Sequence, residues 1–512
     1  MFFVLFVALT ALAGRPPLFW DEAVRVRAGQ QLVEILRGSV PGSPWVWLNA
    51  QVFYPPLLPL LHAAILALGA TPLMAGAWPS LAAYAISGLM IARLARRLGL
   101  GQLGALAALV IFMSLTMAPQ LASSAETESV GALALLVLLD AIISASRRPS
   151  EKAALYVGLI MSLTILLKYD YALLGLGLLG VATLQRMWQR RSFWPGSIGQ
   201  GLCLSLLFGW AWLSIGNSDT KWAALHSFIF QAAGNTGKVG AVYNFDLLHY
   251  PALFLTGSGL GMGLPIIGLI ILSGFFLRAA FRREPAWLLV VVTIGGWYLM
   301  HALASIQWPR YLFEIAPLLA LTAGLTLVRL WEHRPVEHPR RQIASFLLVL
   351  LLAVGVGGQM AGLEPNYSPP LYYGPNPTSD WVLAQLAQGI GTGSGSVIYI
   401  GISNQVSPAT LETEIHAEGR VGISIKTLGE LPTDRRAGAL SAAIRATPGC
   451  QVAAVAIPAG SPLYTGDYRS NHQSEAAYLG AAQALATSGQ LQPLLSAVLP
   501  NGTGVTVYAC SK

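Results

Sequence analysis

Residues 126–148 read ETESVGALALLVLLDAIISASRR, and this stretch decides the fold class of the chain. It starts with two glutamates and ends with two arginines, and residues 128–146 between these ends are almost entirely apolar. A helix needs about 17–25 such residues to cross the hydrocarbon core of a bilayer. The stretch therefore predicts a transmembrane helix with an acidic end and a basic end on opposite sides of the membrane.

The composition of the whole chain agrees with this stretch. Of the 512 residues, 54% are apolar and only 11% are charged, and the mean hydropathy is +0.58. An ordinary soluble domain has roughly 25% charged residues. A soluble globular chain, a disordered chain, a coiled coil and a nucleic-acid binder are therefore excluded. The fold class we predict is a polytopic α-helical membrane protein.

Eleven apolar segments are long enough, or nearly so, to span a bilayer. They are residues 1–19, 73–92, 102–120, 128–146, 152–167, 169–185, 197–215, 252–277, 286–304, 311–328 and 342–362. The run Leu57–Gly69 is about 13 residues long, so we expect an interfacial helix there and not a span. The first segment lacks a basic start, so we expect a membrane anchor and not a signal peptide.

The distribution of positive charge predicts the topology. Residues 1–362 hold 24 Lys or Arg, and sixteen of them form five clusters. The clusters are Arg93/Arg96/Arg97, Arg147/Arg148/Lys152, Arg186/Arg190/Arg191, Arg278/Arg282/Arg283 and Arg329/Arg334/Arg340/Arg341. With eleven spans and a cytoplasmic N-terminus, all five clusters lie in the cytoplasm, as positive charge in membrane proteins prefers. We therefore predict a multi-pass plasma (inner) membrane protein whose loops 20–72, 121–127, 168–171, 216–251 and 305–310 face outward.

The tail, residues 363–512, differs in composition and holds nine acidic and seven basic residues. Strand-like runs at Ser396–Ile400, Gln451–Ile457 and Gly504–Ala509 alternate with helical runs at Thr378–Gln388, Ala437–Ala446 and Glu475–Thr487. The alternation predicts a small extracytoplasmic α/β domain after a transmembrane domain of residues 1–362. Cys450 and Cys510 both lie in this tail and could form a disulfide, although two cysteines alone leave the pairing open.

Two acidic motifs emerge on the predicted outer face. Asp21–Glu22 follows the first span, and Glu126 and Glu128 lie in the next outer loop. Because carboxylates also favour helix N-termini, capping of a helix over Glu22–Arg37 is an alternative role for the first motif. Together the motifs could hold an acceptor hydroxyl and a divalent ion, Mg²⁺ or Mn²⁺, with Asp21 and Glu128 as candidate ligands. The sequence establishes no cofactor.

Two cations lie on the same predicted face. Lys168 stands at a junction between spans, and Arg310 opens a later span. They could compensate the charge of an anionic phosphate headgroup, or they could snorkel or pair locally, for example Lys168 with Asp170.

The aromatic residues on this face have two possible roles. Tyr54 and Tyr311 are candidate pocket residues, or they belong with Trp20 and Trp308 to an interfacial aromatic belt. We expect His226 and His301 to be structural.

Five short motifs lie along the chain, and their order is informative when they are taken together. They are Trp20-Asp21-Glu22, Tyr54-Pro55-Pro56-Leu57, the acidic second loop, Leu167-Lys168 and Pro309-Arg310-Tyr311-Leu312. In this order and with this sidedness, the chain resembles the GT-C glycosyltransferases over about residues 1–330. The resemblance is to the branch of protein O-mannosyltransferases and lipid A aminoarabinose transferases.

The resemblance implies an inverting glycosyltransferase that moves a sugar from a polyprenyl-phosphate donor to an acceptor hydroxyl of a lipid, glycan or protein. By resemblance, Asp21 is the catalytic base, Glu22 supports it, and Lys168 and Arg310 hold the donor phosphate. Glu126 or Glu128 completes the acidic site; the pair departs from the single acidic residue usual in this branch.

The main alternative is a transporter or lipid flippase, and a third is a non-catalytic scaffold whose outer domain binds cell-wall material. Transporters tend to show internal repeats and polar residues at mid-membrane. The two halves of this chain show no repeat, and its polar motifs gather at one interface. The transferase is therefore the favoured hypothesis, with membrane lipids as surroundings and no nucleic acid as partner.

Overall fold

The structure is a computed structural model of the chain. It describes residues 18, 20–51, 55–115, 117–148, 150–188, 219–222, 264–302, 309–332, 382–390, 395–400, 406–426, 436–447, 451–456, 469–499 and 504–511. The predicted spans 197–215 and 342–362, the span 1–19 except Leu18, and Tyr54 and Cys450 lie outside these residues.

The chain divides into two compact units, and each is described by itself. The helical unit consists of Met1–Ala11, Asn49–Leu58 and Pro79–Tyr367. The sheet unit consists of Leu12–Leu48, Pro59–Trp78 and Ser368–Lys512. The predicted domain limit at residues 362 and 363 stays a prediction, because residues 333–381 lie outside the described part of the chain.

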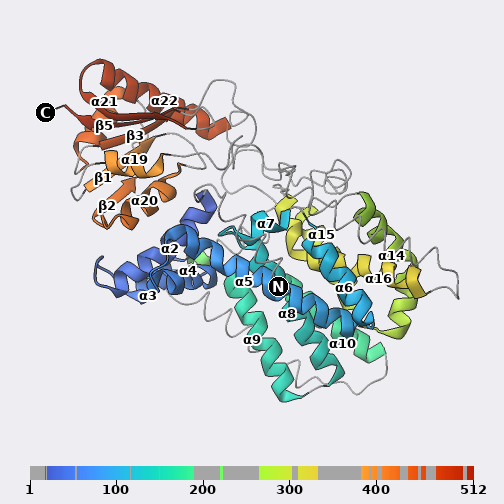
Figure 1. Ribbon diagram of the computed structural model, residues 1–512. Coiled ribbons are helices and arrows are strands. Elements are labelled where there is room, and N and C mark those ends of the chain that lie inside the picture. Colours follow the sequence, from blue (N-terminus) through green and yellow to red (C-terminus); the bar gives the residue numbers. More distant parts are fainter. Residues whose placement is uncertain are drawn as a thin grey trace. The chain divides into compact units, whose positions relative to one another are not determined.

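Helices occupy most of the described part of the helical unit, where the apolar segments predict them (Figure 1). They are α5 (Pro72–Arg97, which begins in the sheet unit), α6 (Gly101–Met113), α7 (Met117–Ala122), α8 (Glu128–Arg147), α9 (Glu151–Leu167), α10 (Asp170–Trp188), α14 (Leu264–Arg283), α15 (Trp287–Ala302), η2 (Pro309–Ile315) and α16 (Ala316–Glu332). Among the described residues, three helical stretches are long and apolar enough to cross a membrane: Pro72–Arg97, Glu128–Arg147 and Arg310–Trp331.

One predicted span differs from the structure. The segment 102–120 is not one helix, because α6 ends at Met113 and α7 begins at Met117. Pro119 explains the break: its ring has no N–H to bond the carbonyl of Leu115 and would clash with that carbonyl in a continuous helix. The amide of Ala118 bonds this carbonyl instead, at 3.0 Å.

The stretch that contains η2 and α16 is the best enclosed of the three that are long enough to cross a membrane, and its residues from Leu312 to Arg329 are buried. It packs closely on α6, because a Cβ added to Gly324 would lie 3.3 Å from the Cβ of Ala108. Close approach through small residues is a common way for helices to pack in membranes. The hydroxyl of Thr326 also donates to the carbonyl of Leu269 on α14, at 2.7 Å.

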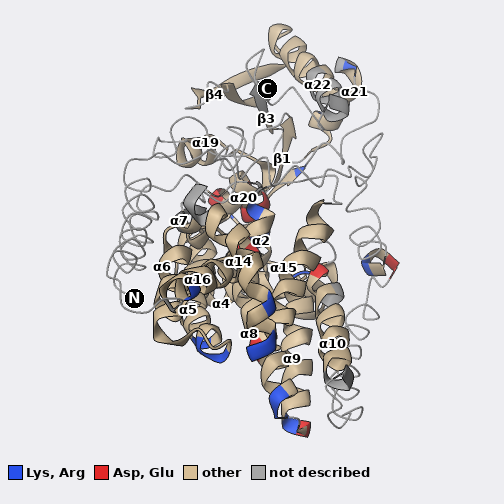
Figure 2. Cartoon of the chain, turned by 90° about the vertical axis from the view of Figure 1, so that its right-hand side faces the viewer, with Lys and Arg blue, Asp and Glu red and all other residues tan. Residues whose placement is uncertain are grey.

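Basic residues gather at one end of α5, α8 and α9, as Figure 2 shows. Asp140 of α8, which is buried, pairs with Arg93 at 3.1 Å and Arg97 at 3.0 Å, while Arg147 pairs with Glu284 at 2.5 Å. A helix of this length rises about 30 Å. Glu128 at the start of α8 and Arg147 at its last turn therefore lie at opposite ends of the bundle.

The sheet unit contains a mixed five-stranded sheet in the order β2-β1-β3-β5-β4. Its strands are β1 (Gly395–Ile400), β2 (Ile423–Lys426), β3 (Gln451–Ala456), β4 (Leu491–Val498) and β5 (Gly504–Cys510). β1 is parallel to β2 and β3, and β5 is antiparallel to β3 and β4. Cys510 is disulfide-bonded.

The strands predicted over residues 396–400, 451–457 and 504–509 coincide with β1, β3 and β5. Two strands of the sheet, β2 and β4, were not predicted from the sequence, and each has a physical reason. β2 has only four residues, and β4 contains Pro493 beside an irregular register, as is typical of an edge strand.

Two helical layers cover the sheet (Figure 1). Helices α19 (Leu383–Gly389) and α20 (Pro408–Ala417) pack on one face, and α21 (Ala437–Arg445) and α22 (Arg469–Thr487) pack on the other. β1 alternates accordingly: Val397 and Tyr399 belong to the first core, whereas Ile398 and Ile400 belong to the second. The helix α20 was not predicted, although Ser407 and Pro408 form a recognisable helix start.

The N-terminal part of the sheet unit is built around α2 (Trp20–Leu36), with α3 (Pro44–Ala50) and α4 (Leu57–Ala67) beside it. The indole of Trp47 on α3 donates to the carbonyl of Ala28 on α2, at 2.7 Å. Gly29 allows α4 to approach α2, since an added Cβ would lie 2.8 Å from the carbonyl oxygen of Pro59 and 2.9 Å from the amide of Ala63. The interfacial position of α4 stays a prediction.

This close approach makes Gly29→Ala a test of the packing. A methyl group at this position must push two helices apart, so we expect a loss of about 1–3 kcal/mol in unfolding free energy. Gly438→Ala on α21 is the matched control, because nothing lies within 4 Å of its added Cβ. It is expected to be neutral or slightly stabilising. Unfolding of the purified full chain in detergent measures both, and equal effects would contradict the packing.

Candidate functional site

Lys168 lies in a break between two helices of the helical unit. It follows the last residue of α9 in an extended conformation, and α10 begins two residues later with Asp170. Its ammonium lies 3.3 Å from Oδ2 of Asp170 and 3.4 Å from Oε1 of Glu314. The local pairing of Lys168 with Asp170, one of the two predicted roles, is therefore present, together with a second carboxylate that was not predicted.

Glu314 is the functional candidate that the sequence analysis missed. Its side chain is fully buried in η2, where it accepts a hydrogen bond of 2.7 Å from the hydroxyl of Tyr171. A carboxylate inside the apolar segment 311–328 is itself a signal, because charged residues at membrane depth are rare and usually functional. Gly131 of α8 makes room for this pair, since an added Cβ would lie 1.8 Å from the Tyr171 hydroxyl oxygen.

Arg310 connects both acidic residues of the second predicted motif to η2. Its Nη1 lies 2.5 Å from Oε1 of Glu126, and its Nε lies 3.4 Å from Oε1 of Glu128. All three side chains are less than one-tenth exposed. The structure therefore brings together Glu126, Glu128 and Arg310, which the sequence placed on the same face from segments nearly two hundred residues apart.

Aromatic rings line the space between the two cations. The Lys168 ammonium lies 5.1 Å from the ring centroid of Tyr311 and 5.3 Å from that of Trp297, and the Arg310 guanidinium lies 5.6 Å from the Tyr311 ring. His301 stacks on Tyr311 at 5.1 Å and also contacts Trp297. Cations over aromatic faces are stabilised by the negative charge of the ring face. Tyr311 thus contacts both predicted phosphate-binding cations.

The electrostatic surroundings keep Lys168 charged. Burial by itself lowers the pKa of its ammonium, but the nearby carboxylates of Glu314 and Asp170 raise that pKa above its usual value. A raised pKa means that the ammonium persists throughout the neutral pH range. Lys168 is therefore a permanent positive charge in a largely buried position.

Asp21 and Glu22 lie in the first turn of α2, in the sheet unit. Glu22 is buried, with 1% of its surface exposed, and Asp21 is partly buried. Carboxylates at this position stabilise a helix N-terminus, so the capping role stays compatible with the structure. Burial of Glu22 goes beyond what a surface cap requires.

The second acidic motif does not fit a metal site in this structure. Glu126 and Glu128 both face the guanidinium of Arg310, which already supplies their positive partner. In the described residues, no group of three or more His, Cys, Asp or Glu side chains could hold a metal ion.

Comparison with known proteins finds one matching family model and similar solved structures. A family model described as dolichyl-phosphate-mannose-protein mannosyltransferase matches residues 54–212. The crystal structure of ArnT from Cupriavidus metallidurans in the apo state is similar at 16% identity and a TM-score of 0.62, over 98% of this chain and 96% of that chain. The same protein bound to undecaprenyl phosphate matches at 16% identity and a TM-score of 0.59, with the same coverage.

No curated protein sequence matches the chain. The predicted resemblance is nevertheless confirmed at the level of the fold. The chain has the fold of ArnT over nearly its whole length, and residues 54–212 match the mannosyltransferase family model.

Proposed function

We propose that this chain is an inverting glycosyltransferase that moves a sugar from a polyprenyl-phosphate donor to an acceptor hydroxyl. The observation that carries the proposal is the pair of largely buried cations, Lys168 and Arg310, which both contact the ring of Tyr311. Its support is the shared fold with ArnT, whose structure has been determined with undecaprenyl phosphate bound.

Phosphate recognition suits the chemistry of these cations. A guanidinium and an ammonium supply several N–H donors, and charge-assisted hydrogen bonds to phosphate oxygens are stronger than neutral ones. As the sugar departs, negative charge grows on the bridging oxygen of the phosphate. Fixed cations that gain interaction during this step lower the barrier, and the leaving group needs no strong acid.

Both cations are already paired with carboxylates in the described structure. An entering phosphate must therefore exchange partners with them, most directly at Lys168, whose ammonium lies between Asp170 and Glu314. The buried Glu314 keeps its second oxygen on the hydroxyl of Tyr171. The two carboxylates hold Lys168 in place before the donor arrives. Their negative charge also repels the entering phosphate.

The reacting hydroxyl must lose its proton as it attacks the anomeric carbon. We assign Asp21 as the base and Glu22 as its supporting carboxylate, on the resemblance of Trp20-Asp21-Glu22 to the family motif. A single displacement inverts the anomeric centre, and a carboxylate near the developing oxocarbenium charge stabilises it. Glu126 and Glu128 pair with Arg310, so in this proposal their role is to hold a phosphate-binding cation.

In this proposal the reaction takes place on the outer face of the membrane. A polyprenyl chain is insoluble in water, so the donor must be reached from the bilayer. With the basic end of the bundle in the cytoplasm, the Lys168 and Arg310 end faces the outside, in a multi-pass plasma (inner) membrane protein with an extracytoplasmic tail. The acceptor is a lipid, a glycan or a protein.

A transporter or flippase is the second candidate function. Only the apolar composition and the buried charges favour it. The match of residues 54–212 to a transferase family model and the ArnT-like fold favour the transferase instead.

Binding of undecaprenyl phosphate to the purified protein tests the phosphate site. We expect saturable binding that weakens at least tenfold in Lys168→Ala and in Arg310→Ala, because a hydrogen bond to a charged group contributes about 1.5–3 kcal/mol. Lys152→Ala and Arg96→Ala are matched controls, since both side chains are exposed at the basic end of the bundle. Absence of binding to folded wild-type protein would move the transporter ahead of the transferase.

Replacement of Asp21 by Asn separates chemistry from binding. We expect the rate of sugar transfer to fall by a factor of about 10²–10⁴, the usual contribution of a general base. Undecaprenyl phosphate should bind as before, and the thermal unfolding temperature should stay near that of the wild type. Transfer at the wild-type rate would exclude Asp21 as the base.

Glu314→Gln tests the exchange of partners at Lys168. The amide retains the size of the side chain and removes the competing negative charge, so undecaprenyl phosphate should bind about tenfold more tightly. Glu284→Gln, which removes the carboxylate that pairs with Arg147 at the basic end, should leave the affinity unchanged. Weaker binding in Glu314→Gln would instead show that Glu314 serves mainly to position Lys168.

A further inference from the structure

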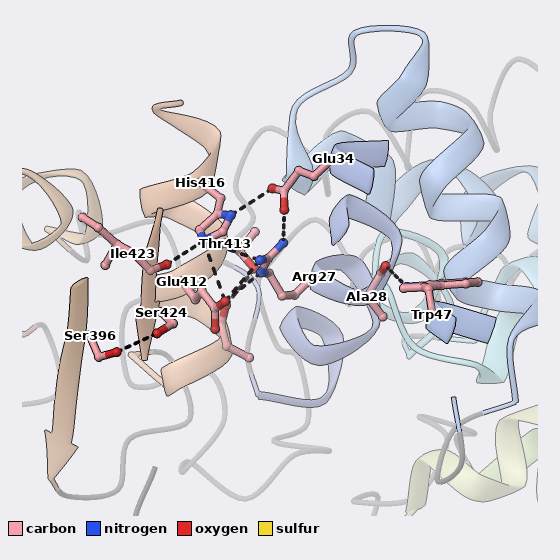
Figure 3. Close-up of polar contacts among 11 residues, drawn as sticks. Arg27, Ala28, Glu34, Trp47, Ser396, Glu412, Thr413, His416, Ile423 and Ser424 are labelled. Carbon is pink, nitrogen blue, oxygen red and sulfur yellow. Dashed lines mark hydrogen bonds and ion pairs between the residues drawn. The ribbon is translucent and has the colours of Figure 1, made fainter. Parts of the chain in front are cut away.

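Helix α20 of the C-terminal sheet packs against α2, whose first turn carries Asp21 and Glu22. The two helices are nearly four hundred residues apart in the sequence and belong to the same unit. Figure 3 shows the contacts that Arg27 and Glu34 of α2 make with Glu412 and His416 of α20. Three contacts connect them, near the start, the middle and the end of α2.

The contact near the start of α2 is buried. The hydroxyl of Thr410 donates to the backbone carbonyl of Leu18, at 3.0 Å, three residues before Asp21. Thr410 is itself held in place, because its amide donates to the hydroxyl of Ser407 at the N-terminus of α20, at 3.1 Å. The side chain of Thr410 is only 1% exposed. This bond therefore connects the first turn of α20 to the segment that leads into α2.

The contact in the middle of α2 is a branched ion pair (Figure 3). Arg27 donates through Nε and Nη2 to Oε1 of Glu412, at 3.2 and 3.1 Å, and through Nη1 to Oε2 of Glu34, at 3.0 Å. One guanidinium thus joins a carboxylate of α20 to a carboxylate of its own helix. A fixed, planar set of donors of this kind specifies geometry as well as attraction.

The contact at the end of α2 involves His416. Its Nδ1 lies 2.9 Å from Oε1 of Glu34, and its Nε2 lies 2.8 Å from the carbonyl of Ile423 on β2. Both ring nitrogens therefore face oxygen atoms, one on α2 and one on β2. Arg27 and Glu412 are the other charged groups near the ring.

The surroundings of Glu34 agree with this ionic arrangement. Burial by itself raises the pKa of its carboxyl, but the hydrogen bond from His416 and the charge of Arg27 lower that pKa below its usual value. Glu34 is therefore an anion at neutral pH, and this stabilisation is lost only as the pH falls through the lowered pKa.

We infer that Thr410, Glu412 and His416 are positioning residues that hold α2, and with it Asp21 and Glu22, in the geometry required for transfer. The C-terminal sheet is by this inference part of the catalytic machinery and not an independent accessory domain. The inference rests on the proposed function in one respect: Asp21 must be the base for the positioning to affect the reaction.

Amide hydrogen exchange of the full chain in detergent tests the contacts without any substrate. Thr410→Val keeps the shape of the side chain and removes the hydroxyl, so the amides of residues 20–25 should exchange about fivefold faster. Thr410→Ser keeps the hydroxyl and should restore the wild-type rate. Ser441→Ala is the control, because it removes a hydroxyl that bonds Gln490 from the other face of the sheet.

A double-mutant cycle tests the distal contact in the same measurement. Glu34→Gln and His416→Gln should each accelerate exchange over residues 26–36, and the effect of the double variant should be smaller than the sum of the two, since both remove the contact between Glu34 and His416. Unchanged exchange of α2 in Thr410→Val and in both Gln variants would overturn the inference. Additive effects of the two Gln substitutions would remove His416 from it.

Two further readouts separate this inference from the proposed function. Undecaprenyl phosphate should bind Thr410→Val as it binds the wild type, while the rate of transfer falls about fivefold with an unchanged donor KM. If the wild type does not bind undecaprenyl phosphate, the proposed function fails while the exchange experiment still decides the contacts. If α2 loosens but transfer is unaffected, the contacts are structural and the positioning role is wrong.

Discussion

A permanent positive charge buried at one end of an apolar helix bundle is the constraint on which the candidate site depends. The ammonium of Lys168 is stable there because two carboxylates face it, and one of them, Glu314, is itself fully enclosed. Glu314 in turn requires the Tyr171 hydroxyl, and this pair requires the absence of a side chain at Gly131. Each of these residues therefore depends on a contact with the next one. Together the contacts connect α8, α9, α10 and η2.

The two ends of the helical unit show how similar charges serve different purposes. At the basic end, Asp140 pairs with Arg93 and Arg97, and these pairs join helices next to exposed arginines. At the other end the cations lie against aromatic rings, and each cation has more than one carboxylate beside it. At this end each cation faces two carboxylates in a largely enclosed space, whereas at the basic end two arginines share one carboxylate.

Much of the fold could be predicted because periodicity and composition are local signals. The helices around residues 128–146 and 152–167 and the strands β1, β3 and β5 occur where the pattern places them. The failures also have local causes: Pro119 interrupts an apolar run, and Pro493 disguises an edge strand. Of the site, Lys168, Arg310, Glu126 and Glu128 were recognised because they gather on one predicted face at the ends of spans. Glu314 lies inside the predicted span 311–328, and the rarity of charge at membrane depth would have identified it.

The sequence by itself determined that the chain is a polytopic helical membrane protein, because apolar length and charge asymmetry depend only on residue order. It also indicated which charged residues were candidates. Only the tertiary structure decided which of them meet: Arg310 pairs with both Glu126 and Glu128, Lys168 with Glu314, and Glu34 with His416. Such pairings join residues 146 to 382 positions apart. They depend on how helices pack, which no local pattern encodes.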